Sequence, residues 1–163
     1  MEAVLEMEKD YQPGSKKQIV IFQLGTEEYA VDITHSREII KPTKITKVPN
    51  TPDYVRGVIN LRGQIVPVID LRKRFNITVG KADKKKERII TIESRDTLVG
   101  LVVDSVNEVF WLNLTELEPA PEIEGGIKQE FIQGVGKKDD RLLILIDMER
   151  LLFADREAES EIM

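Results

Sequence analysis

The sequence of 163 residues contains no cysteine, one histidine and one tryptophan, and aromatic residues make up 6% of it. The absence of cysteine excludes disulfide bonds and thiolate metal sites. Apolar runs reach only about eight residues, far fewer than the ~20 that a membrane-spanning helix requires. Residues 1–18 lack the basic and then apolar layout of a signal peptide. We therefore expect a cytoplasmic protein that does not insert directly into a membrane.

Positive charge is also in short supply. Lys and Arg number 24 against 29 Asp and Glu, which gives a formal net charge of −5 and a pI of about 5.1. Binding to nucleic acid requires a clear cationic face, and "KADKKKER", residues 81–88, is the one basic run. Because this run contains two acids and lies between apolar segments, it is typical of a solvated loop. We expect no nucleic-acid partner and keep a small-barrel nucleic-acid-binding protein as the alternative hypothesis.

The single histidine, His35, is not part of a recognisable catalytic or metal-binding pattern. No metal-ligand spacing surrounds it, and the sequence sets up no nucleophile or acid with it. General acid–base or nucleophilic catalysis needs such groups in defined roles. The sequence therefore predicts a non-catalytic protein without cofactor or metal, in which His35 is a surface or capping residue. An enzyme on a β-barrel scaffold is the least supported hypothesis.

Strand signals, in contrast, are abundant. "QIVIFQL", residues 18–24, and "EYAVDI", residues 28–33, are rich in β-branched and aromatic residues and flank a Gly-Thr turn. "YVRGVINLRGQIVPVID", residues 54–70, has the pattern of a tight hairpin and leads into "DLRKRF", a short helix that we expect Asp70 to cap. "HSREII", residues 35–40, favours one helical turn. Strands therefore dominate, and the expected helices are short.

These signals return in the second half of the chain. A shift of 70 residues aligns Glu108 with Glu38, and a shift of 77 aligns Phe131–Asp147 with the hairpin Tyr54–Asp70. A unit of ~70 residues is too small for two stacked sheets but can close into a small barrel, which removes exposed edges. The repeat therefore predicts an all-β fold of two five-stranded β-barrel subdomains packed side by side. A single larger sandwich would give similar strand signals.

The repeat also sets the expected domain boundaries. Residues 1–17 are mixed and polar and are interpreted as a flexible tail, and residues 154–163 form an acidic tail after a last helix. We expect the first barrel at about residues 18–80 and the second at about 87–150, with terminal segments able to cross between them. Together the barrels make one domain, residues 18–153.

The two hairpins differ at their tips, where the first copy has "INLRGQ" and the second has "GKKDDR". Shared positions are best explained by packing, and Gly57, which returns as Gly134, predicts a bulge or a close backbone approach. Asn60 and Arg62 belong to the first copy alone, which leaves them free for a partner. A solvated arginine is the plain interpretation of Arg62, but an acid such as Glu38 could pair with its guanidinium and hold it outward.

Residues 48–75, "VPNTPDYVRGVINLRGQIVPVIDLRKRF", closely resemble the signature of the CheW family of bacterial chemotaxis coupling proteins. "EEYAVDITHSREII", "GLVVDSVNEV" and "FIQGVGKKDDRLLILIDMERLL" are similar to the same family, so the resemblance covers about residues 18–153. It implies SH3-like barrels with short helices and a C-terminal helix. It also implies a stand-alone, non-catalytic adaptor, recruited to membrane receptor arrays, that joins the cytoplasmic signalling tips of chemoreceptors to the regulatory domain of the histidine kinase CheA.

The resemblance assigns positions to the two partners. Those implied to bind the receptor are Arg62, Glu38, Ile33, Ser36, Val103 and, with the hairpin tip, Asn60. Those implied to face the kinase are Gly57, Arg56, Ile45 and Thr46. Ile33 and Val103 have an equally plain interpretation as barrel core. If the barrels pack side by side, some strand residues must line a groove between them, and an aliphatic groove beside an Arg–Glu pair suits an amphipathic helix of a partner.

Overall fold

The computed structural model describes residues 16–33, 36–78, 80, 83–120 and 127–153 of the chain. In these ranges the strands are β1 (Lys16–Leu24), β2 (Glu27–Asp32), β3 (Ser36–Ile40), β4 (Val55–Leu61), β5 (Gln64–Asp70), β6 (Arg88–Ser94), β7 (Thr97–Val103), β8 (Ser105–Asn113), β9 (Ile132–Lys138) and β10 (Arg141–Ile146). The helices are α2 (Leu71–Arg74), the 3₁₀ helices η2 (Leu114–Glu116) and η3 (Gln129–Phe131), and a helix over residues 148–153. The predicted all-β fold with short helices is confirmed.

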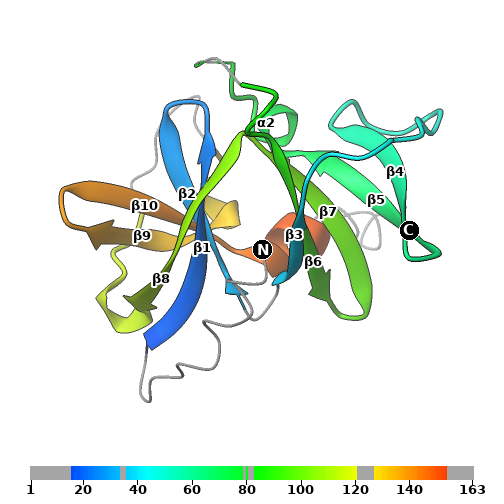
Figure 1. Ribbon diagram of the computed structural model, residues 1–163. Helices are drawn as coiled ribbons and strands as arrows, with labels where there is room; N and C mark the ends of the chain where they lie inside the picture. Colours follow the sequence, from blue (N-terminus) through cyan, green and yellow to red (C-terminus); the bar gives the residue numbers. More distant parts are fainter. Residues whose placement is uncertain (1–15, 34–35, 79, 81–82, 121–126, 154–163) are drawn as a thin grey trace, which may run out of the picture.

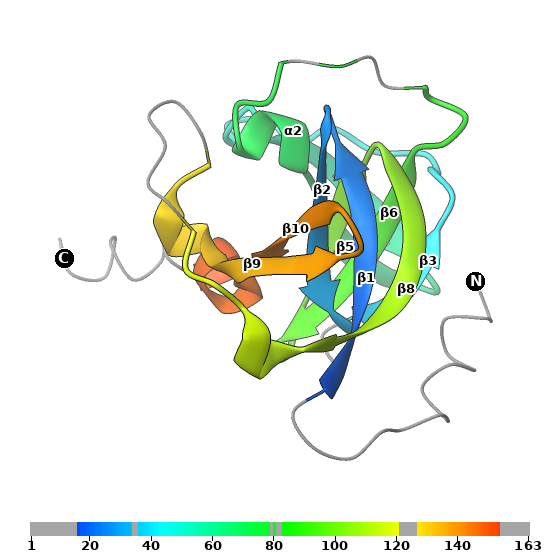
Figure 2. The same cartoon turned by 90° about the vertical axis from the view of Figure 1, so that its left-hand side faces the viewer.

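The strands form two five-stranded sheets that lie side by side (Figure 1). Sheet A has the strand order β8-β1-β2-β10-β9, and sheet B has the order β3-β6-β7-β5-β4. A view turned by 90° places sheet A in front of sheet B (Figure 2). The two orders become identical when the second half of the chain is laid on the first by the sequence repeat. The prediction of two equivalent five-stranded units is therefore confirmed.

Neither sheet, however, is made from one half of the chain. Hairpin β1–β2 pairs with β8 and β10, whereas hairpin β6–β7 pairs with β3 and β5. Sheet A combines residues 16–32 with 105–146, and sheet B spans residues 36–103. The expected boundaries, residues 18–80 and 87–150, allowed a terminal segment such as β1–β2 to cross, but they are corrected for the internal hairpin β6–β7, which joins the first unit. The repeat could not reveal this exchange, because each hairpin has an equivalent in the other half that could make the same strand pairs.

A backbone bridge joins the opposite edges of each sheet. The edge strands of sheet B are β3 and β4, and the chain that leaves β3 reaches β4, where Thr46 N–H donates to Val58 O (2.9 Å) and Val58 N–H donates to Thr46 O (2.8 Å). In sheet A, Glu118 and Val135 make the same pair of bonds at 2.9 and 2.7 Å. Within the described residues these isolated bridges, rather than a full ladder, bring each sheet toward a barrel.

Gly57 makes the bridge of sheet B possible. Its φ is +143°, and the register of β4 against β5 shifts at this residue, as expected for a bulge. A Cβ atom on Gly57 would lie 2.1 Å from Thr46 O and 3.0 Å from Ile45 Cγ2. At the equivalent Gly134, a Cβ atom would lie 3.0 Å from Leu117 Cβ. The predicted close backbone approach is confirmed at both glycines.

Three apolar clusters stabilise the two sheets. Sheet A has its own small cluster, made of Ile19, Ile21, Ala30, Leu112, Leu143 and Leu145. Sheet B has a matching one, made of Ile59, Val66, Val68, Ile89 and Val102. The largest cluster draws on both sheets and includes Val20, Phe22, Val31, Ile90, Ile92 and Leu101. Strands β1 and β6 bury successive residues on both faces, which explains why their sequences are continuously apolar.

Two local predictions are wrong in part. In the stretch where a helical turn was expected, residues 36–40 form strand β3, because their isoleucines pair with those of β6 and the sheet contact outweighs local preference. Lys16 and Lys17, assigned to the N-terminal tail, begin strand β1. The cap of α2 is confirmed, since Lys73 N–H donates to Asp70 Oδ1 (3.3 Å).

Candidate functional site

The tip of the β4–β5 hairpin is a tight turn whose two central residues, Arg62 and Gly63, have φ values of 51° and 84°. Positive φ at both central residues is the property that lets a two-residue turn follow the twist of its strands. The Oδ1 atom of Asn60 accepts a hydrogen bond from Gly63 N–H (2.8 Å). Asn60 therefore has a structural task at the tip, which the comparison of the two hairpins did not reveal.

Arg62 makes a bidentate ion pair with Glu38. Its Nη1 donates to Oε1 (2.8 Å) and its Nη2 to Oε2 (2.7 Å), the fork-to-fork geometry of the stronger charge-assisted bonds. The Arg62 side chain is nevertheless 73% exposed, and that of Glu38 is 23% exposed. The sequence indicated Glu38 as a possible partner of Arg62, and the structure contains this pair. The pair holds an accessible guanidinium in a defined orientation.

Strand β3 presents Glu38 from the opposite edge of sheet B. The buried hydroxyl of Thr91 accepts a bond from Glu38 N–H (3.0 Å) and donates one to Glu38 O (3.1 Å), where the β3–β6 register shifts. The backbone of Glu38 is therefore fixed by β6. Together with Arg62, the carboxylate ties the two edges of sheet B at the hairpin end, while Thr46 ties the chain after β3 to Val58 in the middle of β4.

The apolar positions expected to face the receptor lie elsewhere. Ile33 is 5% exposed and Val103 is 1% exposed, and both belong to the cluster shared by the two sheets. The expectation that their side chains line an open groove is therefore corrected, and their interpretation as core residues holds, because both pack in the apolar cluster between the sheets. The backbone of Ser36 pairs with Ile92 in the β3–β6 ladder.

The four positions expected to face the kinase do come together. Thr46 is bridged to Val58, next to Gly57, and Ile45 contacts the space that a side chain on Gly57 would occupy. Arg56, the fourth, is engaged inside the protein: its Nε donates to Asp70 Oδ2 (3.1 Å), and its Nη1 to Glu87 Oε1 (3.1 Å). Its guanidinium thus links β4 to the residues that precede α2 and β6.

A second charged cluster, on sheet A, was not predicted. Arg141 donates from Nε to Glu28 Oε1 (2.7 Å) and from Nη1 to Glu108 Oε1 (2.9 Å), and Lys138 also pairs with Glu108. Bonds from Arg141 and Asn107 lower the pKa of Glu28 against partial burial, and Lys138 and Arg141 likewise lower the pKa of Glu108. The sequence signal that could have revealed this cluster is the alignment of Glu108 with Glu38. These two acids lie on equivalent edge strands, β8 of sheet A and β3 of sheet B.

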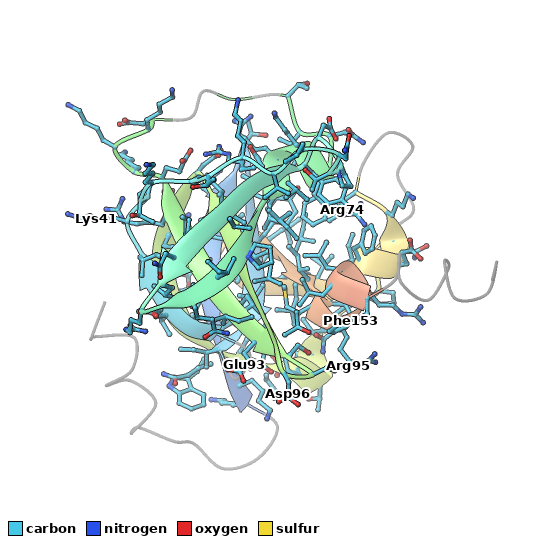
Figure 3. The ribbon with its side chains drawn as sticks, turned by 90° about the vertical axis from the view of Figure 1, so that its right-hand side faces the viewer. Lys41, Arg74, Glu93, Arg95, Asp96 and Phe153 are labelled. Atoms are coloured by element: carbon cyan, nitrogen blue, oxygen red, sulfur yellow. The ribbon has the colours of Figure 1, made fainter. Side chains whose placement is uncertain are left out.

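Polar contacts also join two of the helices, α2 and the helix at residues 148–153, to the hairpin of the other sheet. Asp104 accepts from Arg72 Nε of α2 (2.9 Å to Oδ1) and from Gly25 N–H at the β1–β2 turn (2.8 Å to Oδ2). On the far side, Arg95 at the β6–β7 turn pairs with Glu149 (2.9 Å) and lies 4.6 Å over the Phe153 ring (Figure 3). These contacts fix the orientation of the two sheets.

The described part of the basic run, residues 83–88, begins with the solvated loop that the sequence predicted. Lys84, Lys85 and Lys86 are exposed in a turn that Asp83 closes through a bond from Lys86 N–H to Asp83 O (2.9 Å). In the part of the chain that the structure describes, no three His, Cys, Asp or Glu side chains are placed to hold a metal ion. None of the described helices is long and apolar enough to span a membrane. His35 lies outside the described residues.

Known proteins are similar in sequence to this chain over most of its length. The family model of the CheW-like domain matches residues 18–156. The chain is similar to the chemotaxis protein CheW of Klebsiella aerogenes, with 39% identity over 142 residues that cover 87% of this chain and 85% of that protein. It is also similar to the chemotaxis protein CheW of Bacillus subtilis, with 38% identity over 149 residues that cover 90% and 92% of the two chains.

A solved structure supports the same relationship. The crystal structure of the scaffolding protein TtCheW from Thermoanaerobacter tengcongensis matches with a TM-score of 0.77 and 41% sequence identity, over 86% of this chain and 90% of that chain. The family match spans both sheets, and the relatives are covered over most of their length. This chain therefore belongs to the CheW family.

Proposed function

We propose that the protein is a non-catalytic chemotaxis adaptor that couples the cytoplasmic tips of chemoreceptors to the histidine kinase CheA. The observation that carries this proposal is the family match, which runs over residues 18–156 and so includes both sheets. The relatives from Klebsiella aerogenes and Bacillus subtilis are named chemotaxis proteins, and the solved relative is named a scaffolding protein. In this role the protein acts in the cytoplasm and is held at membrane receptor arrays by its partners.

The proposed receptor surface centres on the hairpin tip of sheet B. Arg62 spends two of its five N–H donors on Glu38, which leaves donors for a partner, and its fork is already oriented. An ordered, exposed arginine is typical of residues that dominate binding energy at protein interfaces. Asn60 contributes by fixing the turn. Ser36 lies on the same strand as Glu38, whereas Ile33 and Val103 are buried in the cluster between the two sheets.

The proposed kinase surface lies at the other end of β4, around Gly57, Ile45, Thr46 and Arg56. Gly57 and Arg62 are five positions apart in the sequence, and at ~3.4 Å per residue the two surfaces lie roughly 17 Å apart. This separation lets one subdomain engage two partners at once. An adaptor needs this property, because coupling requires receptor and kinase to be held together.

Replacing Arg62 with alanine should weaken binding to receptor signalling-tip fragments by about tenfold or more, because an oriented interface arginine is lost. Binding to the kinase should stay unchanged, since the kinase surface is at the far end of β4. The measurement is a pull-down with receptor fragments, run beside a thermal melt.

Arg95→Ala provides the matched control. Arg95 also occupies a hairpin turn with positive φ and also pairs with a glutamate, but it lies on the β6–β7 hairpin. It should bind receptor fragments as the wild type does. Equal receptor binding by Arg62→Ala and the wild type would remove the role proposed for the tip.

A further inference from the structure

A hollow of ≈ 450 Å³ opens beside the proposed kinase surface, between the chain that follows β3 and the start of β4 and α2. Its lining residues are Ile45, Lys47, Val48, Thr51, Pro52, Asp53, Val55, Arg56 and Lys73. Ile45 and Arg56 belong to both the hollow and the proposed kinase surface. The hollow is therefore continuous with that surface and is large enough to receive a side chain of a partner.

The hollow offers apolar contact. Ile45, Val48, Val55 and Pro52 supply aliphatic lining. Val48 is 38% exposed. The other exposed large hydrophobic residues in the described part of the chain are Ile65 and Leu142, and both lie outside the hollow. Together the aliphatic lining residues make a concave apolar surface, which is the usual form of a binding site.

The lining of the hollow holds more cations than acids. Its charged residues are Lys47, Arg56 and Lys73 against Asp53. Arg56 is held by Asp70 and Glu87, which do not line the hollow. Lys47 and Lys73 are the lining cations outside these two ion pairs, and they suit a carboxylate of a partner.

The net positive charge of the whole subdomain also favours an acidic partner. Residues 36–103, which form sheet B, carry 15 Lys and Arg against 7 Asp and Glu, whereas the rest of the chain carries 9 against 22. The acidic protein thus has one basic subdomain. Such a field attracts acidic surfaces and orients them before contact.

We propose that the hollow receives an aliphatic side chain of the CheA regulatory domain, and that Lys47 and Lys73 bind a carboxylate beside it. This inference rests on the proposed function, because it names the chemistry of the kinase contact. The aliphatic group packs on Val48 and Ile45. The carboxylate sits at the rim, where a lysine can reach it as a mobile point charge.

The test is the affinity of the isolated CheA regulatory domain for charge-reversal variants, measured by titration calorimetry. Lys47→Glu and Lys73→Glu should each weaken binding by about tenfold or more at low salt, because like charges then meet at the rim. Asp53→Asn should bind more tightly than the wild type, since a competing acid is removed. Added salt should reduce the differences between the variants.

Lys44→Glu is the matched control, since Lys44 is exposed on the same segment as Lys47 but lies outside the hollow. It changes the net charge equally and should have a smaller effect than Lys47→Glu. Equal losses for both would show that only the overall field matters and would overturn the specific contact. Val48→Asp should also weaken binding, with Ile65→Asp, at an exposed position outside the hollow, as its control.

The outcomes separate this inference from the function on which it rests. If the wild type does not bind the regulatory domain, the proposed function and the hollow both fail. If the wild type binds and Lys47→Glu and Lys73→Glu bind equally well, the adaptor function stands and the hollow is not the contact. If lysine substitutions of single acids in the regulatory domain restore binding to Lys47→Glu, the restoring position identifies the carboxylate.

Discussion

Replacing Gly57 with alanine should destabilise the protein by about 3 kcal/mol or more and abolish kinase binding. The new Cβ atom would lie 2.1 Å from Thr46 O, well inside van der Waals contact, and the φ of +143° is rarely adopted by residues with a side chain. Relief requires the backbone to move away from β4, which breaks the two bonds between Thr46 and Val58. The measurement is urea denaturation, with binding to the CheA regulatory domain measured on the folded fraction.

Gly63→Ala separates the clash from the backbone strain. Gly63 also has a positive φ, 84°, but no atom lies within 4 Å of the place where its Cβ would be. Its cost should be confined to the strain of a left-handed residue, about 1–2 kcal/mol. Similar losses of stability for the two variants would show that the approach of Thr46 to Gly57 is not what the site depends on.

Replacing Asp104 with alanine should cost about 3 kcal/mol of unfolding free energy. Both oxygens of this buried carboxylate accept bonds from Arg72 Nε (2.9 and 3.0 Å), and one also accepts from Gly25 N–H. The variant leaves a partly buried guanidinium without its carboxylate and removes a link between α2 and the β1–β2 turn. The measurement is the midpoint and slope of urea denaturation.

The Arg95–Glu149 pair provides the comparison for Asp104. It joins the other helix to the other hairpin, but both of its side chains are about half exposed. Glu149→Ala should therefore cost under about 1 kcal/mol, as exposed ion pairs generally do. A cost for Asp104→Ala as small as that for Glu149→Ala would contradict a structural role for the buried link.

The repeat in the sequence predicted the number and type of strands, because strand patterns depend on local alternation and turns. It could not predict which hairpin joins which sheet. The pairs β1–β2 and β6–β7 have the same pattern, and the exchange is decided by packing between elements distant in the chain. The same limit applies to Ser36–Ile40, where pairing with β6 decides that the segment is a strand.

For the candidate site, the sequence predicted two features: the close backbone approaches at glycines, and one ion pair between residues distant in the chain. Gly57 and Gly134 predicted close approaches, and Glu38 was named as the partner of Arg62. The sequence left open whether Ile33 and Val103 lie in the core or line a groove, because the pattern of a strand covered on both faces is the same in the two cases.

The sequence also did not predict the internal role of Arg56. Its partners, Asp70 and Glu87, lie 14 and 31 residues away in the chain. No local pattern specifies such a contact. Side-chain pairs of this kind depend on the packing of β4 against α2 and β6.

Coupling of receptors to CheA by this protein can be measured as kinase autophosphorylation in a reconstituted mixture. Receptor signalling fragments and CheA are combined with and without the protein, and the complexes are sedimented before the activity is measured. We expect receptor fragments to change CheA activity, and to co-sediment with CheA, only when the protein is present. Receptor control of CheA that is equally strong without the protein, or a protein that sediments with neither partner, would contradict this expectation.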